Sequence, residues 1–174
     1  MPHEHASIPY KPHTAIITVS SSRFESRLKG DDIEDKSGDW AEERLREEGI
    51  EEIYRYLVRD SKWQIINSIE KAIYNGCELI IIIGGSGVSP SDVSYMAVKS
   101  ILDEELTAFP ALFTLYSEKE VGARAVSTRA VAGFYKSCLI FLLPGSLNAV
   151  KTAMNKIIMK EYQHLLWLRN FGKI

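Results

Sequence analysis

The sequence is poor in cysteine, in long apolar runs and in net charge. Its two cysteines, Cys77 and Cys138, are too few for a disulfide framework and show no metal-ligand spacing. Apolar runs such as Leu79–Ile83 are far too short to cross a bilayer. A net charge of -2 and a pI near 6.1 provide no basic field for a nucleic-acid backbone. These absences argue against a membrane or a nucleic acid as partner.

The first residues also lack the apolar stretch of a secretory signal peptide, so we expect a cytoplasmic protein. Residues 1–13 contain three prolines and His3, His5 and His13, and we interpret them as a flexible arm of a kind that often lies on a neighbouring subunit. A metal site at the His-x-His pair is the less favoured alternative. Residues 14–174 are long enough for one ordinary domain, and 45% of the chain is apolar.

The periodicity of the chain predicts an α/β fold, a three-layer sandwich with a mostly parallel, mixed central sheet. Leu79–Ile83 does not alternate, so both of its faces should be buried, as in a central parallel strand. A polar break at Lys136–Ser137 predicts a hairpin, which makes the sheet mixed. The expected strands are residues 15–19, 53–58, 79–83, 126–135 and 138–143, the expected helices are 39–48, 61–75, 92–103, one from Pro110 and one after Ser146, and 21–38 is expected to be a loop.

Four polar or glycine-containing segments directly follow expected strands. They are Ser20–Ser22, Arg59–Asp60, Gly84–Asp92 and Pro144–Ser146. Because ligands of open α/β sheets bind at the carboxyl ends of the strands, this convergence predicts a binding site.

The strongest of these segments is the glycine-rich turn. Glycines at Gly84, Gly85 and Gly87 permit positive φ and let backbone N–H groups converge on an anion, and three serine hydroxyls, at positions 86, 89 and 91, can donate hydrogen bonds to phosphate oxygens. The turn lacks the Gly-Lys-Ser/Thr of a P-loop and the third glycine of the dinucleotide fingerprint. It predicts a phosphate site, and the alternative is a tight turn before a helix.

Two carboxylates accompany the turn. Asp60 and Asp92 each precede an expected helix, so N-capping explains each one alone. Together they would place two carboxylates beside an anion-binding loop, which suits a Mg²⁺ ion between them and a polyphosphate. Residues 144–146 form a second small phosphate-compatible turn, and residues 35–38 are either a helix start with Ser37 as N-cap or a substrate loop.

These segments and their order resemble the MoaB/Mog family of molybdenum-cofactor biosynthesis proteins, and the resemblance extends from about Ala15 to Phe171. The short Asp-x-Ser-Gly loop and the Arg-Ala-Val-Ala-Gly segment are more similar to the MoaB branch. The matching segments are Thr18–Ser20 with Arg23, Asp35–Gly38, Val58–Asp60, Ile83–Ser94, Thr128–Gly133 and Leu143–Ser146.

The resemblance implies an enzyme, a molybdopterin adenylyltransferase that uses ATP and Mg²⁺ and releases pyrophosphate. It implies that Asp60 and Asp92 are the essential acidic pair, as catalytic residues and metal ligands. It also implies a homotrimer or a hexamer built as a dimer of trimers. The implied binding residues are Gly84, Gly85, Ser86, Gly87, Ser89, Ser94, Asp35, Ser37, Gly38, Pro144, Gly145 and Ser146.

One segment departs from the family pattern. Ala108-Phe-Pro-Ala111 stands where the family usually has Gly-Phe-x-Glu, and Thr114 stands where it usually has arginine. This departure favours the alternative hypothesis, a molybdopterin-binding or assembly protein that has lost adenylyl transfer.

Overall fold

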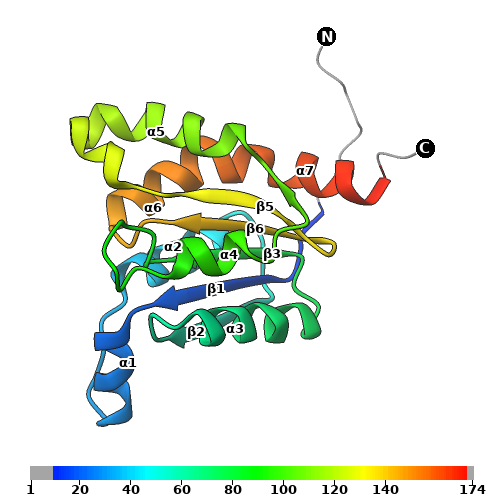
Figure 1. The fold of residues 1–174 in the computed structure, drawn as a ribbon. Helices are drawn as coiled ribbons and strands as arrows, with labels where there is room; N and C mark the ends of the chain where they lie inside the picture. The colour runs from blue at the N-terminus through cyan, green and yellow to red at the C-terminus, as the bar shows by residue number, and fades with distance from the viewer. Residues whose placement is uncertain (1–9, 172–174) are drawn as a thin grey trace.

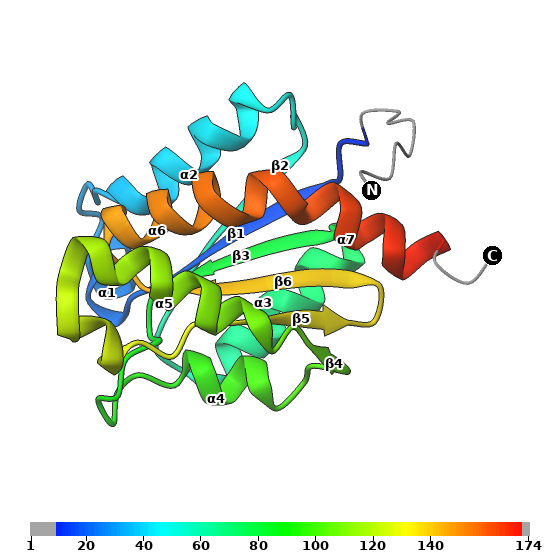
Figure 2. The same cartoon turned by 90° about the horizontal axis from the view of Figure 1, so that it is seen from above.

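The computed structural model describes residues 10–171, and it contains one six-stranded mixed sheet covered by helices on both faces (Figures 1 and 2). The strand order is β2-β1-β3-β6-β5-β4, in which the first four strands are parallel and β5 and β4 reverse direction in turn. The expected α/β fold with a mixed sheet is therefore confirmed. The strands are β1 (Thr14–Val19), β2 (Ile53–Val58), β3 (Leu79–Ile83), β4 (Glu104–Glu105), β5 (Val131–Tyr135) and β6 (Cys138–Leu143).

The helices form the two outer layers. In Figure 2, α2, α5, α6 and α7 lie on one side of the sheet, and α3 and α4 lie on the other. A short π-helical segment, Met154–Ile158, joins α6 to α7, and a 3-10 helix, Gly122–Ser127, follows α5. The α-helices are α1 (Ser21–Leu28), α2 (Lys36–Glu47), α3 (Lys62–Tyr74), α4 (Ser94–Lys99), α5 (Ala108–Val121), α6 (Leu147–Ala153) and α7 (Met159–Phe171).

Side-chain alternation along the central strands divides the apolar residues into two cores. On β3, Ile81 packs with α2, α5 and α6, whereas Ile80 and Ile82 pack with α3 and α4. All five residues of β3 are buried, as expected for a strand with a parallel neighbour on each side.

The largest error in the expected elements is the polar loop at residues 21–38. Residues 21–28 instead form α1, whose N-cap Ser20 accepts a hydrogen bond from the backbone N–H of Arg23. This helix has no buried residue and only two apolar ones, Phe24 and Leu28, so its composition is that of a loop. The second helix begins at Lys36 instead of Asp39, because Asp35 is its N-cap.

Two further boundaries were wrong. The expected helix 92–103 is only Ser94–Lys99, and the chain then forms the short strand β4 beside β5. The expected strand 126–135 begins at Val131, because residues 122–127 turn as a 3-10 helix. The hairpin at Lys136–Ser137 is confirmed by the antiparallel pairing of β5 with β6.

The segment before β1 contacts the body of the protein. The Tyr10 hydroxyl donates to Glu78, the Lys11 ammonium donates to the carbonyl oxygen of Glu48, and the carbonyl oxygen of His13 accepts from the backbone N–H of Glu78 at 2.9 Å. His3 and His5, the pair on which the metal-binding alternative rests, lie outside the described residues. Among residues 10–171, no helix has the length and apolar content to cross a membrane.

Candidate functional site

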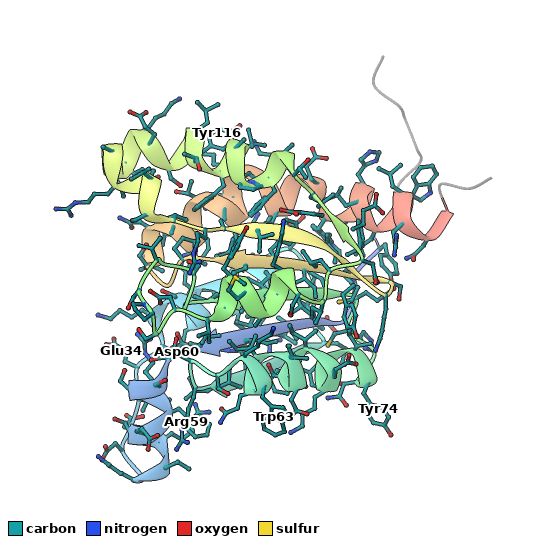
Figure 3. The ribbon with its side chains drawn as sticks, in the orientation of Figure 1. Glu34, Arg59, Asp60, Trp63, Tyr74 and Tyr116 are labelled. Atoms are coloured by element: carbon teal, nitrogen blue, oxygen red, sulfur yellow. The ribbon has the colours of Figure 1, made fainter. Side chains whose placement is uncertain are left out.

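A cleft of about 410 Å³ is lined by residues that follow β1, β3 and β6 at their carboxyl ends. The four segments that were expected to converge do converge here. Figure 3 marks Asp60 where α1 meets this edge of the sheet. The residues that line the cleft are Val19, Ser20, Ser21, Ser22, Arg23, Asp60, Gly84, Gly85, Ser86, Gly87, Asp92, Ser127, Thr128, Pro144 and Gly145.

The glycine-rich turn has the backbone that its sequence predicts. Gly84 and Gly85 have φ angles of +105° and +65°, which only glycine adopts readily. A Cβ on Gly84 would lie 2.4 Å from the carbonyl oxygen of Val19, so the turn packs directly against the end of β1. At Gly87 the reason is space: a Cβ there would lie 2.7 Å from Oδ2 of Asp92. Each glycine is needed for its conformation or for a close approach.

Asp60 is held by the first turn of α1. Its Oδ2 accepts from the backbone N–H of Ser21 at 3.0 Å and from the Ser21 hydroxyl at 2.8 Å. The Ser21 hydroxyl also accepts from the backbone N–H of Asp60 at 3.0 Å. The N-capping explanation for Asp60 is wrong, because Ser61 caps α3. Its Oδ1 lies on the side of Gly85, where an added Cβ would approach it to 3.1 Å.

Asp92 belongs to the turn itself and does not cap a helix. Its Oδ2 accepts from the backbone N–H of Ser89 at 3.2 Å, and its own N–H donates to the carbonyl oxygen of Ser89 at 2.9 Å. Helix α4 begins two residues later, with Val93 as an N-cap that makes no side-chain bond. The N-capping explanation for Asp92 is therefore also wrong.

The two carboxylates have no cationic side chain paired with them in the described part of the chain. Within residues 10–171, neither Asp60 nor Asp92 forms an ion pair, and both line the same cleft. No group of three or more acidic, histidine or cysteine ligands occurs in this part of the chain. Two carboxylates without a third protein ligand suit Mg²⁺, which is bound through one or two carboxylates and substrate phosphates.

The segment of residues 35–38 has a structural role beside the cleft. Oδ2 of the buried Asp35 accepts from Oγ1 of Thr18 at 2.6 Å and pairs with Nη2 of Arg55 at 2.8 Å, while Oδ1 accepts from the Gly38 N–H at 3.1 Å. Ser37 is not the N-cap, as one interpretation had it. Its hydroxyl donates to the carbonyl oxygen of Gly145 at 2.8 Å, which connects α2 to the Pro144–Ser146 turn.

Three other predicted binding residues lie off the cleft. Ser94 is completely buried beneath Gly85, and its hydroxyl has no hydrogen-bond partner among the described residues. Ser89 is exposed at the tip of the turn, 3.0 Å from the Ser91 hydroxyl. Ser146 caps α6 by accepting from the Ala149 N–H at 3.2 Å.

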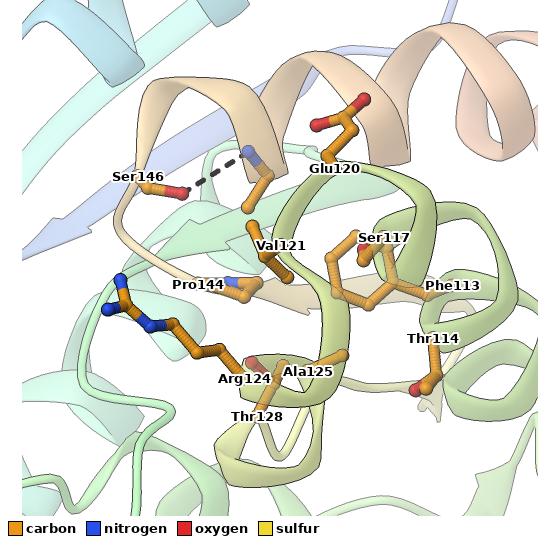
Figure 4. A pocket seen from close by; sticks show the side chains of 11 residues that line it. Phe113, Thr114, Ser117, Glu120, Val121, Arg124, Ala125, Thr128, Pro144 and Ser146 are labelled. Atoms are coloured by element: carbon orange, nitrogen blue, oxygen red, sulfur yellow. Dashed lines mark hydrogen bonds between the residues drawn. The ribbon is translucent and has the colours of Figure 1, made fainter.

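A second, smaller pocket of about 160 Å³ adjoins the cleft, with Thr128 and Pro144 lining both (Figure 4). In Figure 4 the side chains of Arg124 and Glu120 extend to different sides of this pocket. Thr114 borders it, whereas Ala108 and Ala111 line neither cavity. The remaining lining residues are Phe113, Ser117, Val121, Ala125, Ser146 and Ala149.

The segment Ser20–Ser22 was expected at this edge, but none of its residues was named as a binding residue, and neither Arg23 nor Thr128 was included among the binding residues. Ser21, Ser22 and Arg23 open α1, so they were hidden by the expectation of a loop. The serine cap at Ser20, directly after a buried strand, is the signal that predicts a helix start there.

Comparison with known proteins identifies the class to which this fold and cleft belong. The model of the family described as "probable molybdopterin binding domain" matches residues 15–164. A Methanocaldococcus jannaschii protein named "probable molybdopterin adenylyltransferase" is 38% identical over 153 residues, which cover 87% of this chain and 90% of that one. Molybdenum cofactor biosynthesis protein B of Staphylococcus carnosus is 39% identical and covers 87% of each chain.

Solved structures agree. The crystal structure of the tungsten cofactor synthesizing protein MoaB from Pyrococcus furiosus has a TM-score of 0.79 and 35% identity, over 91% of this chain and 96% of that one. The chain belongs to the MoaB/Mog family of molybdenum-cofactor biosynthesis proteins.

Proposed function

We propose that this protein is a molybdopterin adenylyltransferase, which joins molybdopterin to the adenylyl group of ATP and releases pyrophosphate. The observation that carries the proposal is one cleft that combines the glycine-rich turn with two unpaired carboxylates, Asp60 and Asp92. The names of its relatives, which include an adenylyltransferase, support the same activity.

In this proposal the terminal phosphate of molybdopterin attacks the α-phosphorus of ATP. A new bond forms between the molybdopterin phosphate oxygen and the α-phosphorus. The bond between the α-phosphorus and the oxygen that bridges it to the β-phosphate breaks, and pyrophosphate leaves with that oxygen. The N–H groups of residues 85–87 bind and orient phosphate oxygens, which lowers the barrier through positioning and charge stabilisation, whereas the Gly84 N–H donates to the carbonyl oxygen of Leu143 at 3.0 Å and holds the turn in place. No covalent intermediate with the protein is required.

A Mg²⁺ ion fits the donor set of the cleft. Asp60 and Asp92 would hold it, because Gly85 and Gly87 lack the Cβ atoms that would crowd their carboxylate oxygens. When bound, the ion supplies positive charge that neutralises phosphate oxygens. The chain's own contribution is to hold the two carboxylates in place, Asp60 through Ser21 and Asp92 through the turn.

The second pocket suits a ring system of one substrate. Phe113, Val121 and Ala125 offer apolar contacts, and Arg124 and Glu120 offer polar ones. The Ala108 and Ala111 departures lie outside both cavities, so they leave the cleft intact. Thr114 does border the pocket, and it keeps open a second candidate function, a molybdopterin carrier without adenylyl transfer.

The decisive experiment measures pyrophosphate release from ATP, Mg²⁺ and molybdopterin by the wild type and by Asp60→Asn and Asp92→Asn. We expect each substitution to reduce the rate by about 100-fold or more, by analogy with loss of a stabilising group at other transfer sites. The exposed Asp31, changed to Asn, is the matched control and should keep the wild-type rate. Normal turnover by both variants would contradict the proposed roles.

Calorimetry separates the two candidate functions. The enzyme should bind Mg²⁺-ATP and molybdopterin, whereas a carrier should bind molybdopterin and not ATP. Tight molybdopterin binding with neither ATP binding nor pyrophosphate release would favour the carrier.

We further propose a cytoplasmic homotrimer or a dimer of trimers, on the family resemblance. The side chain of Leu166 is buried in the core, while Trp167 and Leu168 leave apolar surface exposed on α7. Light scattering tests the assembly, and a monomer at micromolar concentration would contradict it.

A further inference from the structure

Arg129 makes more contacts with the glycine-rich turn than any role in β5 requires. It lies just before β5, and its backbone N–H donates to the carbonyl oxygen of Ser86 at 3.1 Å. Its guanidinium donates to the carbonyl oxygen of Gly87 through Nε, at 3.1 Å, and through Nη2. Nη2 also donates to the carbonyl oxygen of Asp92 at 3.2 Å. One side chain thus connects the two ends of the Gly87–Asp92 segment.

The segment between those ends has little other support. Residues 88–91 are all exposed, and the hydrogen bonds within the turn join Ser89 to Asp92 and to the hydroxyl of Ser91. The guanidinium is itself held against the Tyr95 ring, with its central carbon 5.0 Å from the ring centroid. Tyr95 lies in the first turn of α4, so the contact also fixes the start of that helix to the turn.

The direction of the guanidinium matters for the charge of the cleft. Arg129 contacts the backbone carbonyl of Asp92 and forms no ion pair with its carboxylate. Because the guanidinium binds the backbone oxygen of Asp92, it does not occupy the carboxylate oxygens, which lie at the cleft. The planar fork of an arginine can serve two carbonyl oxygens and stack on a ring at once, which the single ammonium of a lysine cannot do.

We propose that Arg129 is the positioning residue of the site, which closes the Gly87–Asp92 segment so that the Asp92 carboxylate faces the cleft unpaired. The inference rests on the proposed function for what Asp92 does there. The claim that Arg129 makes the turn rigid does not depend on the proposed function, because the rigidity of the turn can be measured without substrate.

The test compares Arg129→Lys with the wild type in two measurements. Amide hydrogen exchange should become about tenfold faster in residues 86–94 of the free variant, as expected for the loss of one to two hydrogen bonds, while strands β3 and β6 keep their protection. The Mg²⁺ concentration for half-maximal pyrophosphate release should rise about tenfold, with the rate at saturating Mg²⁺ nearly unchanged. A merely structural role would lower the amount of folded enzyme and leave the Mg²⁺ dependence as it is.

Tyr95→Leu is the second variant, and Arg27→Lys on the surface of α1 is the control. Tyr95→Leu removes the ring beneath the guanidinium, so it should shift the exchange rate and the Mg²⁺ requirement in the same direction as Arg129→Lys but by a smaller factor. Arg27→Lys should shift neither. Unchanged exchange in residues 86–94 together with an unchanged Mg²⁺ requirement in Arg129→Lys overturns the inference. A wild type that releases no pyrophosphate contradicts the proposed function, and the exchange comparison then still decides the inference about the turn.

Discussion

Asp60 and Ser21 exchange three hydrogen bonds across the opening of the cleft, although 39 residues separate them in the chain. The backbone N–H and hydroxyl of Ser21 donate to the Asp60 carboxylate, and the hydroxyl accepts from the Asp60 N–H. The pair therefore joins the end of β2 to the start of α1. It also fixes one carboxylate oxygen, while the other lies toward the glycine-rich turn.

Substitution of Ser21 by alanine tests this relationship. The variant loses the hydroxyl donor to the carboxylate and leaves the Asp60 N–H without its acceptor. We expect pyrophosphate release to fall about tenfold, since a hydrogen bond to a charged group contributes roughly 1.5–3 kcal/mol. Ser26→Ala, on the same helix and outside the cleft, is the control. Equal rates for the two variants would show that Ser21 does not position Asp60.

Gly85→Ala should weaken anion binding by the turn. The new Cβ would lie 2.3 Å from the Ser94 hydroxyl and 3.1 Å from Oδ1 of Asp60, at a φ of +65°. Gly30→Ala is matched in its positive φ of +85° but meets no atom within 4 Å. We expect calorimetry with Mg²⁺-ATP to show at least a roughly tenfold loss of affinity for the first and wild-type affinity for the second, which suffers only backbone strain of about 1–2 kcal/mol. Retained affinity in Gly85→Ala would mean that the ligand does not use the turn.

Arg55→Met should destabilise the fold. Arg55 bonds Asp35 at 2.8 Å, Asp39 at 3.1 Å and Glu42 at 2.9 Å, and the Asp35 carboxylate is almost fully buried. Removal of one partner leaves a buried charge, which costs about 3 kcal/mol for fully buried pairs and less here, because the Arg55 side chain is partly exposed. Urea unfolding should show a loss of about 2 kcal/mol, against about 0.5 kcal/mol or less for the surface variant Arg46→Met.

Glu42 should make stability depend on acidity. Burial by itself raises the pKa of the Glu42 carboxyl, but hydrogen bonds and charge from Arg46 and Arg55 outweigh it and bring the pKa below its usual 4.5. A carboxyl with a lowered folded-state pKa stabilises the fold above its unfolded pKa and loses that contribution as the pH falls through the folded value. The stability difference between wild type and Glu42→Gln should therefore be constant from pH 7 to 5 and shrink below pH 4.5. A difference that persists at pH 3 would contradict this.

The two cysteines should be unreactive in the folded protein. Burial raises the pKa of the Cys77 thiol to about 11 and also raises that of Cys138, and both side chains are almost completely covered. Because only the thiolate reacts, a disulfide reagent at pH 8 should label neither residue in buffer and both in denaturant. Rapid labelling of folded protein would indicate local opening at the end of α3 or at β6.

Some of the site could be predicted because its signals are local. The run Leu79–Ile83 and the glycines that follow it predict a buried strand and a turn within nine residues, and the structure contains both. Helix α1 could not be predicted in this way, because none of its residues is buried and it owes its place to Ser20 and to the Asp60 carboxylate. The N-capping explanations for Asp60 and Asp92 were plausible from position alone, but Ser61 caps α3, and α4 begins two residues after Asp92.

The sequence by itself determined that Leu79–Ile83 is buried on both faces, that a hairpin makes the sheet mixed, and that a glycine-rich turn follows the buried strand. It also determined the family resemblance. Each of these rests on short motifs whose residues are close together in the chain. Only the tertiary structure decided which polar residues face the cleft. Asp35 pairs with Arg55, and the Ser37 hydroxyl donates to Gly145. Ser94 is buried beneath Gly85. Asp60 and Asp92 line the cleft and have no ion-pair partner among the described residues. The physical reason is that a carboxylate is available to a ligand only when it reaches the cleft and no cation of the fold pairs with it, and both conditions depend on distant segments.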